Sequence, residues 1–367
     1  MQYRVLPHGG EKISVIGLGT GSFSGSEQQM VQMFDTAIQH GVNLIDIGSI
    51  YQEPFFPALA KALDGRRDQV FTQSHFGMVY KDGRCGPSKR LDEIKAQLRY
   101  EFQTLHADYT DFGLIHCIDD LDEVERVLHG GLLDYMKGLK AEGVIRHLGF
   151  SSHNPEAARR ILDSGVIDLF MFSINPFYDF EIGNYANGNA AERAKFYREC
   201  KSAELGITVM KPYAGGQLLD GARSQFKQAL TTTQCIQYAL DRPAVLSVLP
   251  GIRNLADLQD ALDYLEATPA QKDYSVISSF TDQLAEGVCV YCDHCLPCPV
   301  GMDIGRINKY YDLALTGDQM AADHYQALSV KASACVQCGH CEKACPFHVG
   351  QMARMKEIAQ SFGEEIL

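Results

Sequence analysis

The sequence predicts an α/β protein in which eight parallel strands alternate with helices, followed by a small, mainly helical module rich in cysteine. Short apolar runs alternate with longer helical patterns over the first 280 residues, and eight such runs can be counted. Strands that alternate with helices are typical of parallel βα units, and eight strands close a (β/α)8 TIM barrel of roughly 250 residues. Eight of the 12 cysteines fall after residue 288. We therefore expect a barrel over residues 1–275 and a cysteine module over 276–367.

The strand candidates, in chain order, are KISVIGLG, GVNLIDIG, QVFTQSHF, DYTDFGLIHC, VIRHLGFSS, IDLFMFSIN, GITVMKPY and AVLSVLPG. Stretches such as SEQQMVQMFDTAIQHG and NPEAARRILDSG separate them with helical character. The active site of a TIM barrel lies at the C-terminal ends of its strands, so polar residues there are the candidates. They are Asp46, Tyr51, His75, His116, Ser151, Ser152, His153, Asn175 and Lys211.

Two cysteine runs dominate the C-terminal module. Cys335, Cys338, Cys341 and Cys345 precede Pro346 in the C-x2-C-x2-C-x3-C-P pattern of bacterial ferredoxins. The first run has one residue fewer before its last cysteine and comprises Cys289, Cys292, Cys295 and Cys298. In two-cluster proteins the fourth cysteine ligates the other cluster. We therefore predict one 4Fe–4S cluster on Cys289, Cys292, Cys295 and Cys345, and a second on Cys335, Cys338, Cys341 and Cys298.

Structural zinc is the alternative for these cysteines, but four evenly spaced thiols before a proline, twice over, fit it poorly. The stretch between the two runs has helical periodicity, so an α-helical two-cluster module is expected. Cys85, Cys117, Cys200 and Cys235 are interpreted as unligated core or surface thiols.

Composition limits the other functional classes. The chain is 46% hydrophobic and 22% charged, as in ordinary globular proteins, and its net charge of −13 argues against nucleic acid as a partner. The sequence has neither an apolar run of membrane-spanning length nor a recognisable signal peptide. We expect a cytoplasmic protein with reduced thiols, and the clusters favour an anaerobic cell.

The barrel segments resemble the aldo-keto reductase family. NLIDIGSIY is similar to its Asp-to-Tyr motif, GLIHC ends in its strand-four histidine, and GLGTGS resembles its first-strand motif. GFSSHN, VMKPYAGG and LPGIRNLADLQDAL are similar to its cofactor-binding segments. A subgroup of the family carries a C-terminal two-cluster domain, which the cysteine runs match.

The resemblance implies reduction of a carbonyl, or of a conjugated alkene, by NADH or NADPH bound across the barrel mouth. Tyr51 would donate the proton, with Asp46 behind it, and His116 would orient the carbonyl. The cofactor would contact Thr20, Gly21, Ser151, Ser152, Met210, Lys211, Gly251, Arg253 and Asn254.

The sequence departs from the family at several positions. His75 aligns with the catalytic lysine, which favours the charged form of the tyrosine. His75 can replace that lysine in a slower or pH-shifted enzyme, the site can run other redox chemistry, or the barrel has lost catalysis. Ser152, Met171 and Met210 replace an Asn, a Gln and a Tyr that are common in the family. Asp257 falls where an Arg often binds the 2′-phosphate of NADP, which slightly favours NADH unless Asp257 simply faces water.

The partner expected at the barrel mouth is a small molecule. An aromatic substrate would suit a pocket walled by Phe55, Phe56, Phe76, Tyr80, Phe177, Tyr178 and Tyr213, although core packing is the alternative for half of them. The clusters can relay electrons from a ferredoxin or another redox protein, dock a partner, or be structural. A flavin stays open, because a barrel can bind FMN without an obvious fingerprint. The alternative function is an electron-transfer or docking protein with a retired barrel.

Overall fold

The fold was analysed in a computed structural model that describes residues 1–48, 55–81, 84–182, 186–224, 226, 228–280, 287, 289, 291, 294–315, 322, 325–345 and 347–364. One parallel sheet of eight strands forms the centre of the molecule, in the order β12-β11-β10-β9-β8-β5-β4-β3. The strands are β3 Leu18–Gly19, β4 Leu44–Ile47, β5 Phe71–Phe76, β8 Thr110–Ile115, β9 Ile145–Ser152, β10 Leu169–Ser173, β11 Gly206–Met210 and β12 Val245–Val248.

Two parallel bridges join the edges of this sheet. Ile16 pairs with Val248, and Gly19 pairs with Gly251. The backbone N–H of Gly17 donates to the carbonyl of Val248 at 2.9 Å, so the first and last strands meet. The predicted TIM barrel is therefore confirmed, with a β-strand in each of the eight predicted segments.

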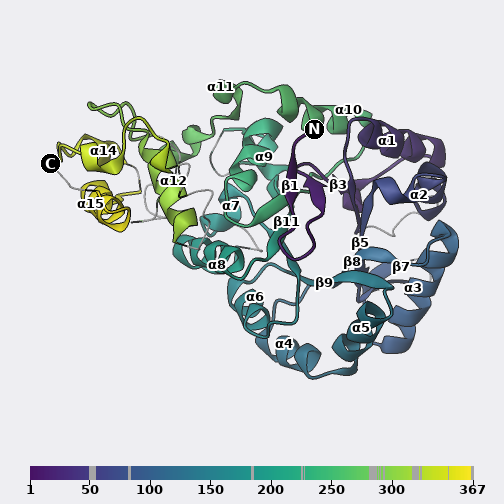
Figure 1. Cartoon of the computed structure of the whole chain (residues 1–367). Helices are drawn as coiled ribbons and strands as arrows, with labels where there is room; N and C mark the ends of the chain where they lie inside the picture. The colour runs from purple at the N-terminus through teal and green to yellow at the C-terminus, as the bar shows by residue number, and fades with distance from the viewer. Residues whose placement is uncertain are drawn as a thin grey trace.

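Helices surround the sheet, as Figure 1 shows. They are α1 Glu27–Gln39, α2 Phe55–Leu63, α3 Leu91–Leu105, α4 Leu121–Leu128, α5 Gly131–Ala141, α6 Pro155–Leu162, α7 Pro176–Asp179, α8 Ala190–Ser202, α9 Thr232–Leu240, α10 Leu255–Leu262 and α11 Pro269–Lys272. Several begin directly after a strand because an Asn caps them. Asn154 and Asn175 each accept from a backbone N–H of the following helix, and a proline occupies the first helical position in both.

The first strand candidate, KISVIGLG, is not one strand. Its first part forms β2 (Lys12–Ser14), which pairs antiparallel with β1 (Tyr3–Val5), and only its end forms β3. The side chain of Asn43 accepts from the backbone of Ser14 at 2.8 Å and ties the hairpin to the barrel. Leu6 and Ile13 from the hairpin belong to the same buried cluster as side chains of the four barrel strands β4, β8, β10 and β12.

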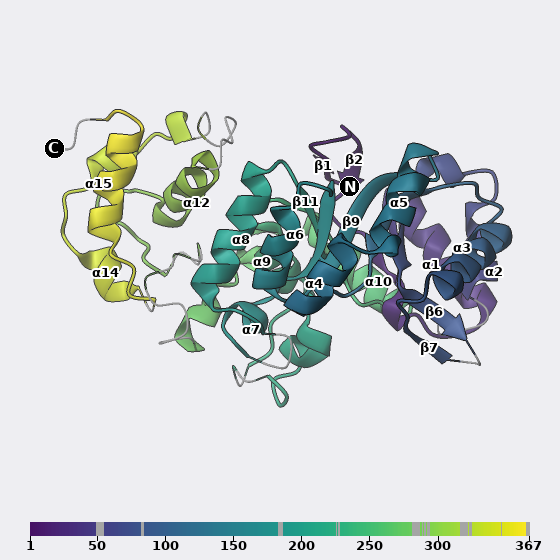
Figure 2. The same ribbon diagram turned by 90° about the horizontal axis from the view of Figure 1, so that it is seen from below.

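A second hairpin, β6 (Met78–Lys81) and β7 (Arg84–Pro87), follows β5. Seen from below in Figure 2, this hairpin and α7 lie on the opposite side of the barrel from β1 and β2. The β1–β2 hairpin therefore lies at the N-terminal end of the strands, and the opposite end carries the residues that follow the strands.

The C-terminal region is mainly helical, as predicted. It contains α12 (Ile304–Ala314), α14 (His340–Ala344) and α15 (Gln351–Ser361), which Figures 1 and 2 both show grouped at one end of the molecule. Its own core includes Ile304, Ile307, Tyr311 and Met355. Helix α12 contacts α8 of the barrel. None of the helices among the described residues combines the length and apolar character that a membrane span requires.

Candidate active site

Three predicted catalytic side chains form a hydrogen-bonded chain at the C-terminal ends of β4, β5 and β8. Nε2 of His75 lies 2.8 Å from Oδ1 of Asp46, and Nδ1 of His75 lies 3.1 Å from Nδ1 of His116. The side chains of Asp46 and His75 are about 95% buried. The predicted acid Tyr51 lies outside the described residues. The barrel therefore brings Asp46, His75 and His116 together, in that order.

The proton count in this chain decides what His116 can do. In each contact one atom donates and the other accepts. A neutral His75 that donates to Asp46 accepts from His116, so Nε2 of His116 is left as an acceptor. A doubly protonated His75 donates to both partners, so His116 carries its own proton on Nε2 and can donate it to a substrate oxygen.

His116 itself is held neutral. Its burial, together with repulsion from His75 and Lys89, lowers the pKa of His116 to about 3. The ammonium of Lys89 donates to the backbone carbonyl of His116 at 3.2 Å. At neutral pH His116 is therefore a hydrogen-bonding group and not a source of positive charge.

Gln73 and Thr208 fix Asp46 from inside the barrel. The amide nitrogen of Gln73 donates to Oδ1 of Asp46 at 2.6 Å, and Thr208 donates to the amide oxygen of Gln73 at 3.1 Å. All three side chains are buried. Oδ1 of Asp46 thus accepts hydrogen bonds from both Gln73 and His75, which fixes its position. The sequence reasoning did not predict the contact with Gln73.

The first predicted cofactor segment lies beside Asp46. The hydroxyl of Thr20 donates to the backbone carbonyl of Asp46 at 2.6 Å. Gly21 follows in a 3-10 turn, Thr20–Ser22, and a Cβ on Gly21 would meet no atom within 4 Å. Gly251 is exposed and reaches the same edge through its bridge to Gly19. At Gly21 this edge leaves space beside the backbone, as a bound dinucleotide requires.

The predicted phosphate-binding residues are engaged with each other. Arg253 forms two side-chain bonds to Asp257, at 2.7 and 3.1 Å, and the side chain of Asn254 caps α10. The Arg253 guanidinium lowers the pKa of Asp257. Asp257 is therefore paired with Arg253, which differs from the simple exposure considered from the sequence.

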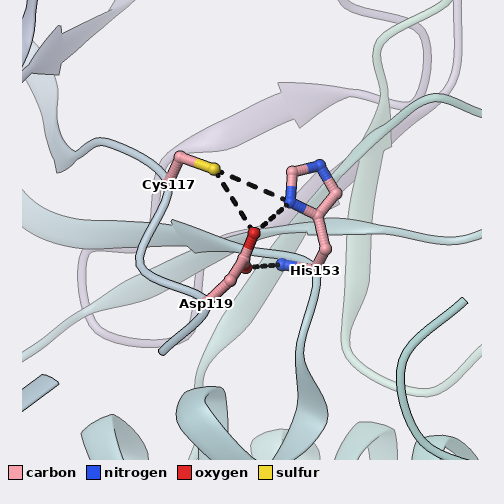
Figure 3. Close-up of side chains that lie close together, drawn as sticks. All are labelled: Cys117, Asp119 and His153. Atoms are coloured by element: carbon pink, nitrogen blue, oxygen red, sulfur yellow. Dashed lines mark hydrogen bonds and ion pairs between the residues drawn. The ribbon is translucent and has the colours of Figure 1, made fainter. Parts of the chain in front are cut away.

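A compact group of Cys117, Asp119 and His153 lies beside the residues predicted to hold the nicotinamide. Oδ2 of Asp119 lies 2.9 Å from Nδ1 of His153 and 3.4 Å from Sγ of Cys117 (Figure 3). Ser152 donates to Oδ1 of Asp119 at 3.0 Å, and the backbone N–H of Cys117 donates to Ser151 at 2.7 Å. Both predicted serines are thus tied to this group.

Lys211 and Met210 end β11 at the same mouth. Lys211 has a left-handed backbone with φ of 55°, and its carbonyl accepts from the side chain of Asn175 at 2.8 Å. Burial lowers the pKa of Lys211 to about 8, partly opposed by Cys117 and Asp119. Met210 is half-buried. These positions agree with the strand-end reasoning that singled out Lys211.

Most of the proposed aromatic wall belongs to the core. Phe55 is 1% exposed and Phe56 is 3% exposed, in a cluster with α1. Phe177 packs edge-on against Phe226, with centroids 4.7 Å apart. Six of the seven aromatics considered are buried, and Tyr80 is half-buried. Core packing, the alternative reading, therefore describes Phe55 and Phe56, because α2 turns them toward α1.

Four of the predicted cluster ligands in the C-terminal region lie around one pocket. Cys298, Cys335, Cys338 and Cys341 line this pocket. Left-handed backbone at Gln337 bends the chain between the first two cysteines of the second run. Four converging thiols are the donor set of a 4Fe–4S cluster, so these residues fit one.

The other predicted ligands lie nearer the barrel. Cys345 is 9% exposed and belongs to the large barrel core, against which Cys289 also packs. Cys295 is buried in the C-terminal core, and Cys292 lies outside the described residues.

The sequence reasoning did not single out the surroundings of position 117. It interpreted Cys117 as an unligated thiol, and the fold places Cys117 beside Asp119 and His153 at the barrel mouth. A signal was present, because HCID and SSHN end neighbouring strands and must lie side by side. Cys200 and Cys235 are fully buried in the core, as expected for unligated thiols.

Comparison with known proteins identifies both regions. The model of the Aldo/keto reductase family matches residues 15–231, and that of a 4Fe-4S dicluster domain matches residues 288–350. The uncharacterized oxidoreductase YqkF of Bacillus subtilis is 24% identical over 301 residues, covering 78% of this chain and 90% of YqkF. Protein tas of Escherichia coli is 28% identical over 192 residues, covering 44% and 55% of the two chains.

Solved structures share the barrel fold. The holo form of aldo-keto reductase AKR11C1 from Bacillus halodurans superposes with a TM-score of 0.62 at 20% identity, covering 77% of this chain and 96% of its own. An aldo/keto reductase from Klebsiella pneumoniae in complex with NADP and acetate gives a TM-score of 0.54 at 18% identity, with the same coverage.

Proposed function

Because this chain belongs to the aldo/keto reductase family, we propose that it uses NADH or NADPH to reduce a carbonyl group of a small molecule at the barrel mouth. The observation that carries the proposal is the chain of hydrogen bonds from Asp46 through His75 to His116. It supplies a buried carboxylate, a titratable group and a neutral imidazole in the order that carbonyl reduction needs.

A nicotinamide bound here would supply a hydride, which carries two electrons, to the carbonyl carbon as the C=O π bond breaks. The carbonyl oxygen takes one proton, and we propose that Tyr51 donates it. With His75 doubly protonated, His116 donates a hydrogen bond from its Nε2–H to the same oxygen and orients the substrate, while it keeps its own proton. Asp46 holds the positive charge on His75, which in turn favours the tyrosinate that forms. A proton from solvent then restores Tyr51.

We propose NADH as the preferred nicotinamide. The 2′-phosphate of NADPH adds negative charge, and Asp257 lies where a positive residue would be needed to receive it. Arg253 is paired with Asp257, so its charge is already balanced. The Klebsiella pneumoniae structure is in complex with NADP, so the proposed preference rests on the residues of this chain.

The two clusters are proposed to relay electrons between the barrel and a ferredoxin or another redox protein. Support comes from the contact between the two regions. The ring of Phe347, two residues after Cys345, stacks on Phe180 with centroids 5.7 Å apart. Phe180 directly follows α7, the helix that Asn175 caps at the barrel mouth. Clusters pass single electrons, so a flavin released on heat denaturation would identify the mediator between hydride and cluster.

One set of contacts favours the second candidate, an electron-transfer or docking protein with a retired barrel. Ser152 is bonded to Asp119, and Arg253 to Asp257, so two predicted cofactor contacts are already satisfied within the protein. This candidate predicts clusters that dithionite reduces, with no binding of either nicotinamide.

The deciding experiment uses the anaerobic, cluster-loaded protein. Binding of NADH and NADPH is titrated by fluorescence, and turnover is followed with 4-nitrobenzaldehyde as the probe carbonyl. We expect binding and turnover, and a loss of kcat of roughly 10²–10⁴ for Tyr51→Phe. His147→Gln is the matched control, because His147 bonds to Glu11 away from Asp46 and His116. Unchanged turnover in Tyr51→Phe would overturn the role of the tyrosine, and absence of nicotinamide binding would favour the second candidate.

A further inference from the structure

Cys117, Asp119 and His153 converge on one point at the C-terminal ends of β8 and β9. Their ligand atoms are Sγ, Oδ2 and Nδ1, and all lie within 4.8 Å of one another. Figure 3 shows the three side chains pointing toward a common centre from two adjacent strand ends. A thiol, a carboxylate and an imidazole are each ordinary ligands of a transition-metal ion.

The geometry points to a Zn²⁺-binding site formed by Cys117, Asp119 and His153. The three edges of the ligand triangle measure 3.4 Å for Sγ–Oδ2, 3.8 Å for Sγ–Nδ1 and 2.9 Å for Nδ1–Oδ2. Tetrahedral zinc with ordinary bond lengths requires edges of about 3.6, 3.6 and 3.4 Å. The first two edges differ from these by about 0.2 Å and the third by about 0.5 Å.

A triangle distinguishes a metal site from a catalytic relay. In a nucleophile–base–acid relay the imidazole lies between the other two groups, so each ring nitrogen serves one partner. Here Nδ1 of His153 faces both Cys117 and Asp119, and the same oxygen of Asp119 faces both of its partners. Zinc would replace the protons that these groups share and would bind all three atoms at once.

The surroundings hold the three side chains in place. The backbone N–H of His153 donates to the other carboxylate oxygen, Oδ1 of Asp119, at 2.6 Å, and Ser152 donates to the same oxygen. Oδ2 is thereby directed toward the centre of the triangle. Such outer-shell bonds are a regular feature of metal sites, because they fix the orientation of the ligands.

The site has one open side. His153 is 4% exposed, whereas Cys117 and Asp119 are half-buried and therefore accessible to solvent. Three protein ligands with an accessible fourth position are typical of a catalytic zinc and not of a structural one. Cys117 directly follows His116, so an oxygen of a small molecule at the barrel mouth is the ligand expected in the fourth position.

The ammonium of Lys211 would repel a bound metal ion, since it interacts electrostatically with Cys117, Asp119 and His153. A variant without this charge therefore tests the proposal by an increase in zinc affinity. Removing that charge in Lys211→Met should strengthen zinc binding, by about fivefold for each 1 kcal/mol of repulsion removed.

The experiment uses the full-length, cluster-loaded protein, prepared without oxygen and checked for its iron content. Zinc binding is measured by competition with a chromophoric chelator, and the bound zinc is examined by X-ray absorption. We expect one zinc per chain with one sulfur near about 2.3 Å and the remaining ligands nitrogen or oxygen near about 2.0–2.1 Å. Zinc in vacant cluster positions would show sulfur ligands only, and that result overturns the proposal.

Variants make the assignment specific. Cys117→Ala and the near-isosteric Asp119→Asn should each weaken binding by at least the roughly 10–100-fold that loss of an outer-shell partner costs. Cys235→Ala is the matched control, because Cys235 is a fully buried thiol outside this group. Unfolding midpoints show whether each variant is folded. Equal zinc affinity in folded Cys117→Ala and wild type would overturn the site. All of these readouts are independent of nicotinamide reduction.

Discussion

His75 differs from the lysine expected at its position because an imidazole has two nitrogens and each has a different partner. Nε2 bonds to Asp46 and Nδ1 to His116, so a proton gained on one side of the ring changes what the other side can donate. An ammonium has donors only, so it cannot change from a donor to an acceptor toward His116. The substitution therefore couples His116 to Asp46 through a single titratable ring.

Replacing His75 tests this coupling. His75→Leu should reduce kcat by roughly 10²-fold or more, because His116 loses the partner that sets its tautomer. In His75→Lys we expect turnover to persist, since an ammonium at this position still favours the charged form of the tyrosine. Turnover of 4-nitrobenzaldehyde measures both variants. A kcat of His75→Leu equal to that of wild type would contradict the role of His75.

Glu101 provides a second prediction at the scale of one residue. It lies on α3 and lines a small pocket together with His75, and Gln97 donates to its carboxylate at 3.0 Å. Burial raises the pKa of Glu101 to about 7, against the opposing effects of Gln97 and His75. Because the folded state holds this proton more tightly than the unfolded state, the stabilising effect is complete below about pH 4.5 and is lost as pH rises through about 7.

Glu101→Gln should remove this loss, since the amide mimics the protonated acid. The shift from 4.5 to about 7 corresponds to about 3 kcal/mol at most, so the variant should gain stability over wild type between pH 5 and 8. The measurement is the thermal unfolding midpoint in anaerobic buffers of increasing pH. Glu204→Gln, at an exposed position, is the control. A constant difference between Glu101→Gln and wild type across this range would refute the prediction.

At the scale of elements, α10 combines a helix cap with the charge pair that faces the expected phosphate. The side chain of Asn254 caps the helix by accepting from the backbone N–H of Asp257. The carboxylate of Asp257 accepts from both the backbone N–H and the guanidinium of Arg253. The positive end of the helix favours an anion nearby, but Asp257 already supplies one. The element thus neutralises its own attraction for a phosphate.

Asp257→Ala should release Arg253 and change the choice of nicotinamide. Removing one negative charge near the 2′-phosphate is worth about 1 kcal/mol at high dielectric, or about fivefold in affinity. We expect the ratio of the NADPH to the NADH dissociation constant to fall by about that factor, as measured by fluorescence titration. Asp263→Asn, at the other end of α10, should leave the ratio unchanged. An unaltered ratio in Asp257→Ala would show that this pair does not select the cofactor.

Strand order and strand ends were predictable because apolar runs and their polar termini are local features of the sequence. Asp46, His75 and His116 could be singled out for that reason. The bond between His75 and His116 could not, since it depends on the orientation of two rings from β5 and β8. For Phe55 and Phe56 the sequence left a pocket wall and core packing open, because a position next to Tyr51 does not reveal that α2 places both rings in the buried cluster with α1.

At the scale of the whole molecule, the cysteine module is joined to the barrel by both apolar and charged contacts. Phe347 is 1% exposed and stacks on Phe180 of the barrel, and both belong to the same buried core. Lys309 on α12 forms an ion pair with the half-buried Asp241 after α9, at 2.5 Å. Its charge is the chief influence that lowers the pKa of Asp241 against the effect of burial. Cys345, a predicted cluster ligand, is thereby fixed against the barrel core.

Phe347→Ala should loosen this junction without removing a cluster ligand. Loss of a buried phenyl ring costs about 3–5 kcal/mol, and this cost falls on the contact between the two regions. We expect faster hydrogen exchange in α7 and α8, together with slower reduction of the clusters by NADH if electrons cross at this contact. Phe362→Ala is the matched control, because Phe362 stacks on Tyr325 within the C-terminal region, with centroids 3.9 Å apart. Phe362→Ala should destabilise the cysteine module while leaving hydrogen exchange in α7 and α8 unchanged. Equal effects of both variants on these two helices would show that Phe347 has no special part in joining the clusters to the barrel.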